Sequence, residues 1–325
     1  MKKGKPAGRT AVLKYREKGG IRNLPHNLKV DFLKNKGCYL LILPILIWFV
    51  IFHYLPMGGL VMAFEKYSPG KGIFGSDWVG FANFQRFFSS IYFWRLIKNT
   101  AILGLMDLVI SFPAPIIFAL LLNEIRRRKF KKVVQTISYM PYFVSTVIMC
   151  GLVIDFVQGG GVISNMIAKS TGGVSQNLLA NGDNFRIIFV LTTVWQNLGY
   201  GSIIYIAALT SVDQELYDAA VVDGAGRWKQ TLHITLPAIT PTIVVMLILK
   251  MSTLLNVSAD KVLLLYSPGI YDKADVISSY VYRTGILEYN YSFSTAVGLF
   301  NSVIATALLL ISNAICRKVT ESSLF

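Results

Sequence analysis

Residues 215–237 read ELYDAAVVDGAGRWKQTLHITLP. Four of their side chains are three or four residues apart and so share one face of a predicted helix: Leu216, Ala219, Ala220 and Asp223. Gly224 and Gly226 end this helix and permit a sharp turn. A second short helix follows, with Trp228 and Leu232 on one side, and Leu236-Pro237 begins the next apolar block. The stretch therefore predicts a pair of short helices whose small side chains let another protein surface approach closely.

The sequence on either side of this stretch is strongly apolar. Of the 325 residues, 54% are hydrophobic and the mean hydropathy is +0.53, which is too apolar for an ordinary soluble protein. Because a helix needs about 20 mostly apolar residues to cross a bilayer, six segments qualify as membrane spans. They lie at about residues 38–64, 97–122, 137–156, 185–209, 238–257 and 293–315.

The distribution of positive charge predicts the orientation of these spans. Residues 1–36 carry eleven Lys and Arg against two acidic residues, residues 126–132 carry six positive charges, and Arg317-Lys318 follow the last span. Lys and Arg concentrate on the cytoplasmic side of membrane proteins. Both termini and the loop at residues 210–236 are therefore expected in the cytoplasm of a multi-pass membrane protein. The segments near 65–95, 158–184 and 258–292 are expected outside.

The basic N-terminal segment has a second interpretation, which is nucleic-acid binding. No aromatic or glycine-patterned RNA-binding motif accompanies the charge, so we interpret it as a cytoplasmic tail beside lipid and expect no nucleic-acid partner. The first apolar block lies too far from the N-terminus for a cleaved secretory signal and is expected to remain as a membrane anchor. The three cysteines lie in or beside apolar segments without metal-like spacing.

Residues 215–237 resemble the EAA loop of bacterial ABC importer permeases. That pattern is Glu-Ala-Ala, three residues, Gly, nine residues, Ile-x-Leu-Pro, and the spacing here matches it from Ala219-Ala220 through Gly224 to Leu236-Pro237. Asp218 replaces the glutamate and is one methylene shorter. Residues 77–84 (DWVGFANF) and the stretch from Tyr266 to Asn301 resemble the carbohydrate branch, which handles oligosaccharides or polysaccharide fragments.

The resemblance implies an all-α membrane protein with six transmembrane helices, the MetI-like core of a type I importer permease. Its predicted parts are a basic cytoplasmic tail at 1–36 and a permease domain at 37–325 that contains a coupling loop at 210–236. The implied partners are a homologous second permease, two ATPase subunits, an extracytoplasmic solute-binding protein and an oligosaccharide substrate, in the bacterial inner membrane. The residues implied to face the ATPase are Glu215, Tyr217, Asp218, Ala219, Ala220, Asp223, Gly224, Arg227 and Trp228.

Polar residues inside predicted spans suggest a lining for the transported molecule, since sugars bind to aromatic faces and to amide or hydroxyl groups. The candidates for the substrate path are Trp195, Gln196, Asn197, Tyr200, Lys250 and Asn256. Aromatic residues at a membrane interface are an alternative explanation for Trp195 and Tyr200. Asp107 in the second span and Lys250 in the fifth have either a functional role, as a polar lining or a charge pair across the bundle, or a structural one, holding helices together or contacting a partner subunit. Spacing does not decide between these two roles.

Other functional classes find less support in the sequence. The chain has no Gly-x-x-x-x-Gly-Lys-Ser/Thr motif and no catalytic cluster, so we expect neither enzymatic activity nor a cofactor in this chain, with ATP and Mg²⁺ bound by a partner ATPase. A secondary transporter is expected to show paired repeats and ion-coupling acids in broken spans, and no repeat is obvious. A permease of the same class for amino acids, phosphate or metals remains an alternative cargo assignment.

Overall fold

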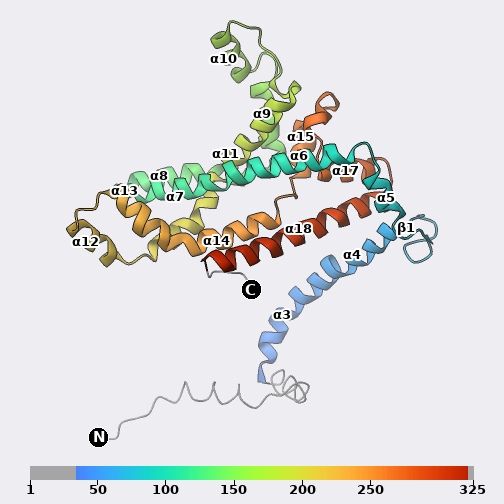
Figure 1. Ribbon diagram of the computed structural model, residues 1–325, viewed down its shortest axis with the longest axis horizontal. Helices are drawn as coiled ribbons and strands as arrows, with labels where there is room; N and C mark the ends of the chain where they lie inside the picture. The colour runs from blue at the N-terminus through green and yellow to red at the C-terminus, as the bar shows by residue number, and fades with distance from the viewer. Residues whose placement is uncertain (1–33, 321–325) are drawn as a thin grey trace. The chain divides into compact units, whose positions relative to one another are not determined.

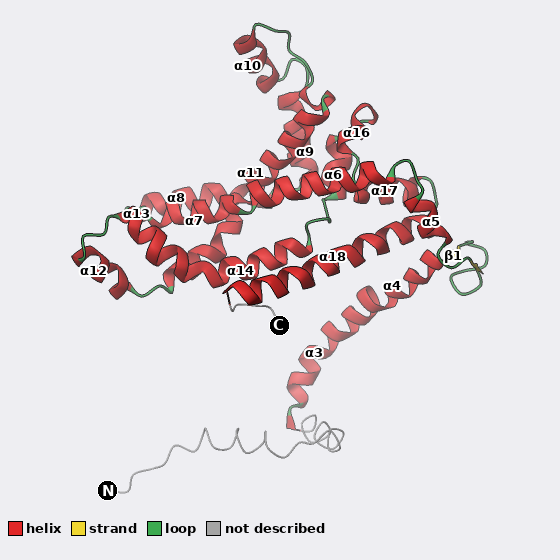
Figure 2. Ribbon diagram, in the orientation of Figure 1, coloured by secondary structure: helices red, strands yellow, loops and turns green. Residues whose placement is uncertain are grey.

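The computed structural model describes residues 34–320 and is almost entirely helical (Figures 1 and 2). Within residues 34–320, six helices are long and apolar enough to cross a membrane: Lys36–Phe64, Phe93–Asn123, Thr146–Thr171, Gly182–Thr210, Arg227–Ser252 and Tyr291–Lys318. The all-α class and the six spans predicted from the sequence are confirmed. Most of the predicted tail, residues 1–33, lies outside the described residues. The chain divides into two compact units at Leu60 and Val61.

The first unit contains one long apolar helix. It consists of α3 (Lys36–Phe49), a π-helical turn η2 (Val50–Tyr54), α4 (Leu55–Met57) and the first residues of the 3-10 segment η3 (Gly58–Phe64), whose last residues belong to the second unit. Side chains are exposed all around α3, and none of them is buried within this unit. A helix that is apolar on every side is expected in contact with lipid or with other membrane helices.

The second unit begins with a short antiparallel hairpin and continues through the other five long helices. The hairpin pairs Glu65 with Trp78 and Lys66 with Asp77. Its two strands and the helices up to the fourth span are β1 (Glu65–Lys66), β2 (Asp77–Trp78), α5 (Ala82–Phe88), α6 (Phe93–Met106), η4 (Asp107–Ser111), α7 (Pro113–Asn123), α8 (Arg128–Tyr139), η5 (Met140–Phe143), α9 (Thr146–Val157), α10 (Val162–Thr171), η6 (Leu178–Ala180) and α11 (Gly182–Thr210).

The remaining elements form the connection to the fifth span, the segment after it and the last helix. They are α12 (Gln214–Val222), α13 (Arg227–Gln230), η7 (Thr231–Thr235), α14 (Leu236–Ser252), α15 (Ala259–Leu265), η8 (Pro268–Ile270), α16 (Tyr271–Ala274), α17 (Ile277–Tyr282), η9 (Arg283–Leu287) and α18 (Tyr291–Thr320). Figure 1 shows α14 running beside part of the longer α18, and these two helices are in contact.

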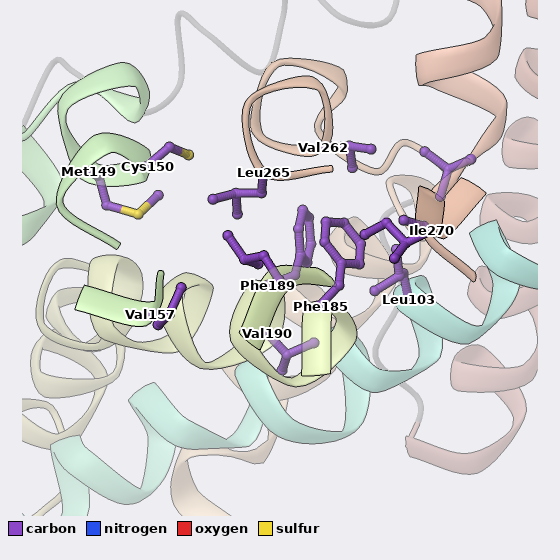
Figure 3. Close-up of a cluster of buried hydrophobic side chains, with 13 residues drawn as sticks. Leu103, Met149, Cys150, Val157, Phe185, Phe189, Val190, Val262, Leu265 and Ile270 are labelled. Carbon is purple, nitrogen blue, oxygen red and sulfur yellow. The ribbon is translucent and has the colours of Figure 1, made fainter. Parts of the chain in front are cut away.

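Helix α11 lies at the centre of the second unit. Asn181 caps its N-terminus by accepting hydrogen bonds from the backbone N–H groups of Asp183 and Asn184. The helix contacts α6, α7, α8, α14, α15 and α16. Phe185 and Phe189 of α11 meet buried side chains of α9 and α15 in the largest apolar cluster (Figure 3). Gly199 permits the closest crossing, because a β-carbon there would lie 2.1 Å from the Ser138 carbonyl oxygen of α8.

Three of the long helices contain a π-helical turn shortly before a proline. These turns are η2 before Pro56, η4 before Pro113 and η7 before Pro237. Proline cannot donate a backbone hydrogen bond and its ring collides with the carbonyl four residues earlier. A wider turn at that point keeps the helix continuous. The apolar segments therefore continue through their prolines as single helices.

Two predicted spans differ from the observed helices. The third, expected at 137–156, is interrupted: α8 ends at Tyr139, Pro141 lies in the 3-10 turn η5, and Ser145 caps the start of α9 by accepting a hydrogen bond from the N–H of Ile148. The long helical candidate there is instead Thr146–Thr171. The fifth helix was expected to begin near Pro237 but begins at Arg227, because η7 accommodates the proline. The predicted second short helix is thus the first part of the fifth span helix.

Candidate coupling segment and transport path

Residues 210–236, which we call the coupling segment, consist of a capped helix, a glycine turn and the first part of the fifth span helix. Asp213 caps α12 by accepting a hydrogen bond of 3.0 Å from the Glu215 N–H. Gly224 ends the helix with φ of +72°, a left-handed conformation that favours glycine. The next helix begins at Arg227. The sequence predicted the first helix and the turn correctly.

Most of the residues implied to face an ATPase are exposed on this segment. The exposed ones are Glu215, Asp218, Ala219, Asp223, Gly224, Arg227 and Trp228, and the half-buried ones are Tyr217 and Ala220. Besides Trp228, four large apolar side chains of the segment are exposed: Leu216, Val221, Val222 and Leu232. Apolar side chains gathered on such a surface are typical of a protein interface.

Two side-chain contacts connect the parts of the coupling segment to the span helices: one joins α12 to the fifth span helix, and the other joins the fifth span helix to the second. The Tyr217 hydroxyl lies 2.9 Å from the hydroxyl of Thr235, which is buried in η7. Arg227 pairs with Glu124 at the end of α7, with an N–O distance of 3.3 Å. Trp228 and Leu232 line one apolar groove of about 630 Å³ together with apolar side chains of α7, among them Ile117 and Leu121. Tyr217 therefore links α12 to the N-terminal part of the fifth span helix, and Arg227 links that helix to the end of the second.

A polar cavity of about 290 Å³ lies among the span helices. Four of the six residues predicted for the substrate path line it: Gln196, Asn197, Lys250 and Asn256. The other lining residues are Leu103, Gly104, Asp107, Thr146, Phe189, Thr193, Thr253, Leu254, Val257, Ser258 and Lys261. The structure thus brings together side chains of the second, third, fourth and fifth span helices. We refer to this space as the polar cavity.

Trp195 and Tyr200 lie outside the lining of the polar cavity. The Trp195 side chain is half exposed on α11. Tyr200 stacks on Tyr142 of η5, with ring centroids 3.8 Å apart and an angle of 6° between the planes. Both residues remain predictions for the substrate path, and neither contributes to the cavity in this chain.

Asp107 and Lys250 form an ion pair in the polar cavity. The Lys250 amine donates a hydrogen bond to Asp107 Oδ2. Asp107 Oδ1 is buried and has no hydrogen-bond partner among the described residues. Two amide side chains of the lining form hydrogen bonds within the chain. Gln196 Nε2 donates to the Val144 carbonyl at 3.2 Å, and Asn256 Oδ1 accepts from Asn301 Nδ2 at 2.9 Å. The charge pair left open by the sequence is therefore present.

Lys261 of α15 is a functional candidate that the sequence analysis missed. Its side chain is 4% exposed, and its amine donates hydrogen bonds to the Phe189 carbonyl at 2.8 Å and to Thr193 Oγ1 at 2.5 Å. The amine also lies 4.5 Å from the centre of the Phe189 ring. Burial lowers the pKa of Lys261 to about 8, so the amine is still mostly protonated near neutral pH. The signal in the sequence was a lone lysine followed by four apolar residues.

A second polar pocket, of about 560 Å³, lies entirely within the segments expected to face outward. Asp275 beside it is fully buried and accepts hydrogen bonds from Arg283 at 3.2 and 2.7 Å. Arg95 of α6 approaches the same carboxylate at 3.5 Å. This network ties residues 266–283 to the start of the second span helix.

Comparisons with known proteins agree with this arrangement of helices. A family model described as the binding-protein-dependent transport system inner membrane component matches residues 111–320. Protein LplB of Bacillus subtilis is 44% identical over 90% of this chain and 92% of its own length. The polygalacturonan/rhamnogalacturonan transport system permease protein YteP of the same organism is 42% identical over 92% of this chain and 93% of its own length.

Solved structures of ABC transporters are also similar to this chain. The chain superposes with a TM-score of 0.83, at 40% identity, on a chain of a bacterial ABC transporter involved in the import of the acidic polysaccharide alginate, covering 90% of this chain and 99% of that one. A bacterial alginate ABC transporter in complex with an alginate pentasaccharide-bound periplasmic protein gives the same TM-score and identity and covers 93% and 100% of the two chains. The chain therefore belongs to the binding-protein-dependent transport system inner membrane components, a family of multi-pass permease subunits.

Proposed function

We propose that this chain is one permease subunit of an ATP-driven importer for oligosaccharides or polysaccharide fragments. The observation that carries the proposal is the polar cavity, which places amide, hydroxyl and charged groups among otherwise apolar span helices. Groups of this kind are expected where a polar molecule crosses the membrane. The relatives named for polygalacturonan, rhamnogalacturonan and alginate transport support a carbohydrate cargo.

A homologous second permease would complete the path, and a solute-binding protein would deliver the cargo from outside. The apolar side chains exposed on the span helices support a helical partner in the membrane. The charge distribution supports an orientation with both termini and the coupling segment in the cytoplasm. In that orientation the pocket beside Arg95 and Asp275 faces the binding protein.

Two ATPase subunits, which hold ATP and Mg²⁺, would dock against the coupling segment of this chain and of its partner permease. Closure of the ATPase dimer moves α12. The Tyr217–Thr235 contact carries that motion into the fifth span helix, and the Arg227–Glu124 contact carries it on to the second. The polar cavity lies further along these same two helices, at Lys250 and Asp107. The polar cavity would therefore open alternately to the two sides of the membrane.

The proposal is tested by purifying the chain with its candidate partner permease, ATPases and binding protein and measuring ATP hydrolysis. A panel of neutral and acidic oligosaccharides, amino acids and phosphate separates the cargo classes. The proposal expects hydrolysis to rise several-fold only when the binding protein carries a saccharide. Stimulation by amino acids or phosphate alone would assign another cargo. A rate of ATP hydrolysis that is the same with and without the binding protein would contradict the proposal.

A further inference from the structure

The polar cavity contains a buried cation without a matching anion. Lys261 donates hydrogen bonds to two neutral oxygens, those of Phe189 and Thr193, and no carboxylate lies within ion-pair distance of its amine in the described part of the chain. An amine has three N–H donors, so one remains for a further acceptor. Charged side chains are seldom buried without a counter-charge, because removing them from water is costly.

The ionisable side chains that line the polar cavity also leave one positive charge without a counter-charge. Lys250 and Lys261 contribute two positive charges and Asp107 one negative charge, which leaves one positive charge in the cavity. The Asp107 carboxylate already forms an ion pair with Lys250 through Oδ2. The uncompensated charge therefore belongs to the cavity as a whole and is available to an anionic ligand.

A structural role for Lys261 does not account for its charge. Its two hydrogen bonds tie α15 to α11, but a neutral amide could donate to the Phe189 carbonyl and the Thr193 hydroxyl without the cost of burying a cation. Arg283, by contrast, is a structural cation of the same unit and is matched by the buried carboxylate of Asp275. Lys261 has no equivalent partner within residues 34–320.

A second, independent feature marks the cavity as a binding site. Asp107 Oδ1 is buried without a hydrogen-bond donor among the described residues, although buried carboxylate oxygens normally have one. A hydroxyl group of a bound ligand would supply that donor. The cavity volume of about 290 Å³ is close to the roughly 300 Å³ at which small-molecule sites begin, so the cavity suits a group of the size of one sugar ring.

We propose that the polar cavity selects uronate residues, with the carboxylate of one acidic sugar ring accepting a hydrogen bond from Lys261 and a ring hydroxyl donating to Asp107 Oδ1. The inference rests on the proposed saccharide import and narrows its substrate class. A carboxylate and a hydroxyl on the same ring satisfy the free amine proton and the unpaired carboxylate oxygen together. A neutral saccharide would leave the cation of Lys261 uncompensated.

The test compares acidic and neutral forms of the same saccharide in the complete transporter. The probes are trigalacturonate and trimannuronate, each beside its methyl ester, which removes the charge and keeps the ring. Uptake into proteoliposomes is measured for the unaltered protein, Lys261→Gln and Lys261→Met, with Lys169→Gln as a control that removes an exposed charge outside the cavity. Because the binding protein is common to all variants, its own preference cancels when acid-to-ester uptake ratios are compared.

The expected result is an acid-to-ester uptake ratio about tenfold lower in both Lys261 variants for at least one saccharide, with no change in Lys169→Gln. A Lys261 substitution that lowers acid and ester uptake equally would assign the residue a structural role and overturn the proposal. If neutral saccharides drive the unaltered transporter and uronates do not, the uronate assignment fails and saccharide import stands. If no saccharide drives it, the proposed function fails as well.

Discussion

The hydroxyl groups of Tyr217 and Thr235 lie 2.9 Å apart and join the exposed helix α12 to a buried position of the fifth span helix. We expect Tyr217→Phe and Thr235→Val each to lower saccharide uptake several-fold while ATP hydrolysis falls less. The double variant should lose no more than either single variant, because the two changes remove one interaction. Thr210→Val is the control, since that hydroxyl bonds to Ala207 within its own helix. Additive losses in the double variant would show that the two residues act separately.

Asp218 is exposed on α12 at the position where the EAA pattern has glutamate. Asp218→Ala should reduce uptake about tenfold, which corresponds to about 1.4 kcal/mol at the ATPase contact. Asp218→Glu should keep uptake near that of the unaltered protein because it retains the charge. Uptake and the thermal stability of the purified permease should be measured together. Equal uptake in Asp218→Ala and the unaltered protein would exclude a coupling role.

The Asp107–Lys250 pair predicts an order of stability among its variants. Asp107→Asn leaves Lys250 and Lys261 without any nearby carboxylate in the polar cavity, whereas Lys250→Gln leaves Asp107 facing Lys261. We therefore expect Asp107→Asn to be the more destabilising, by about 1–3 kcal/mol. The double variant should recover part of that loss, since it no longer leaves Lys250 charged and unpaired. Melting temperatures of the purified complex check this order, and the reverse order would contradict the charge count.

Lys261 predicts a pH dependence of stability in the alkaline range. Its pKa is about 8 in the folded chain, lowered from 10.5 mainly by burial. Between these values the unfolded chain binds more protons than the folded chain, so the contribution of Lys261 to stability rises with pH from about 8 to 10.5. Below that window the folded chain bears the full cost of a buried cation. Lys261→Met should therefore raise the melting temperature at pH 7 by a few degrees.

The difference in melting temperature between Lys261→Met and the unaltered protein should shrink as the pH rises through this window. Lys169→Gln provides the comparison for a general effect of removing positive charge, because Lys169 is exposed on α10. A difference that stays constant from pH 7 to 10 would show that the amine is not the group responsible.

Much of the fold could be predicted because its determinants are local. Apolar blocks of sufficient length define the six helices, and the Gly224 turn is specified by residues next to it. The break in the third span was missed because average hydropathy does not register Pro141 and the Ser145 cap within an apolar run. The start of the fifth span helix was predicted ten residues too late, at Pro237, because the π-helical turn η7 lets the helix continue through this proline.

The site depends on distant residues, and less of it could be predicted. Asp107 and Lys250 are 143 positions apart, so only the packed helices determine that they pair. Gln196, Asn197 and Asn256 were recognised from their polarity within apolar spans. Lys261 was missed because it follows the fifth span, where a lysine is unremarkable until its burial is known.

The most direct test of the account is saccharide uptake by proteoliposomes containing the complete transporter, with and without ATP and the binding protein. Uptake is expected to require both ATP and the binding protein, and to be lost when the ATPase subunits are catalytically inactive. Uptake that persists with inactive ATPase subunits would contradict ATP-driven import and would place the chain among secondary transporters. Uptake without the binding protein would contradict delivery of the cargo by that protein.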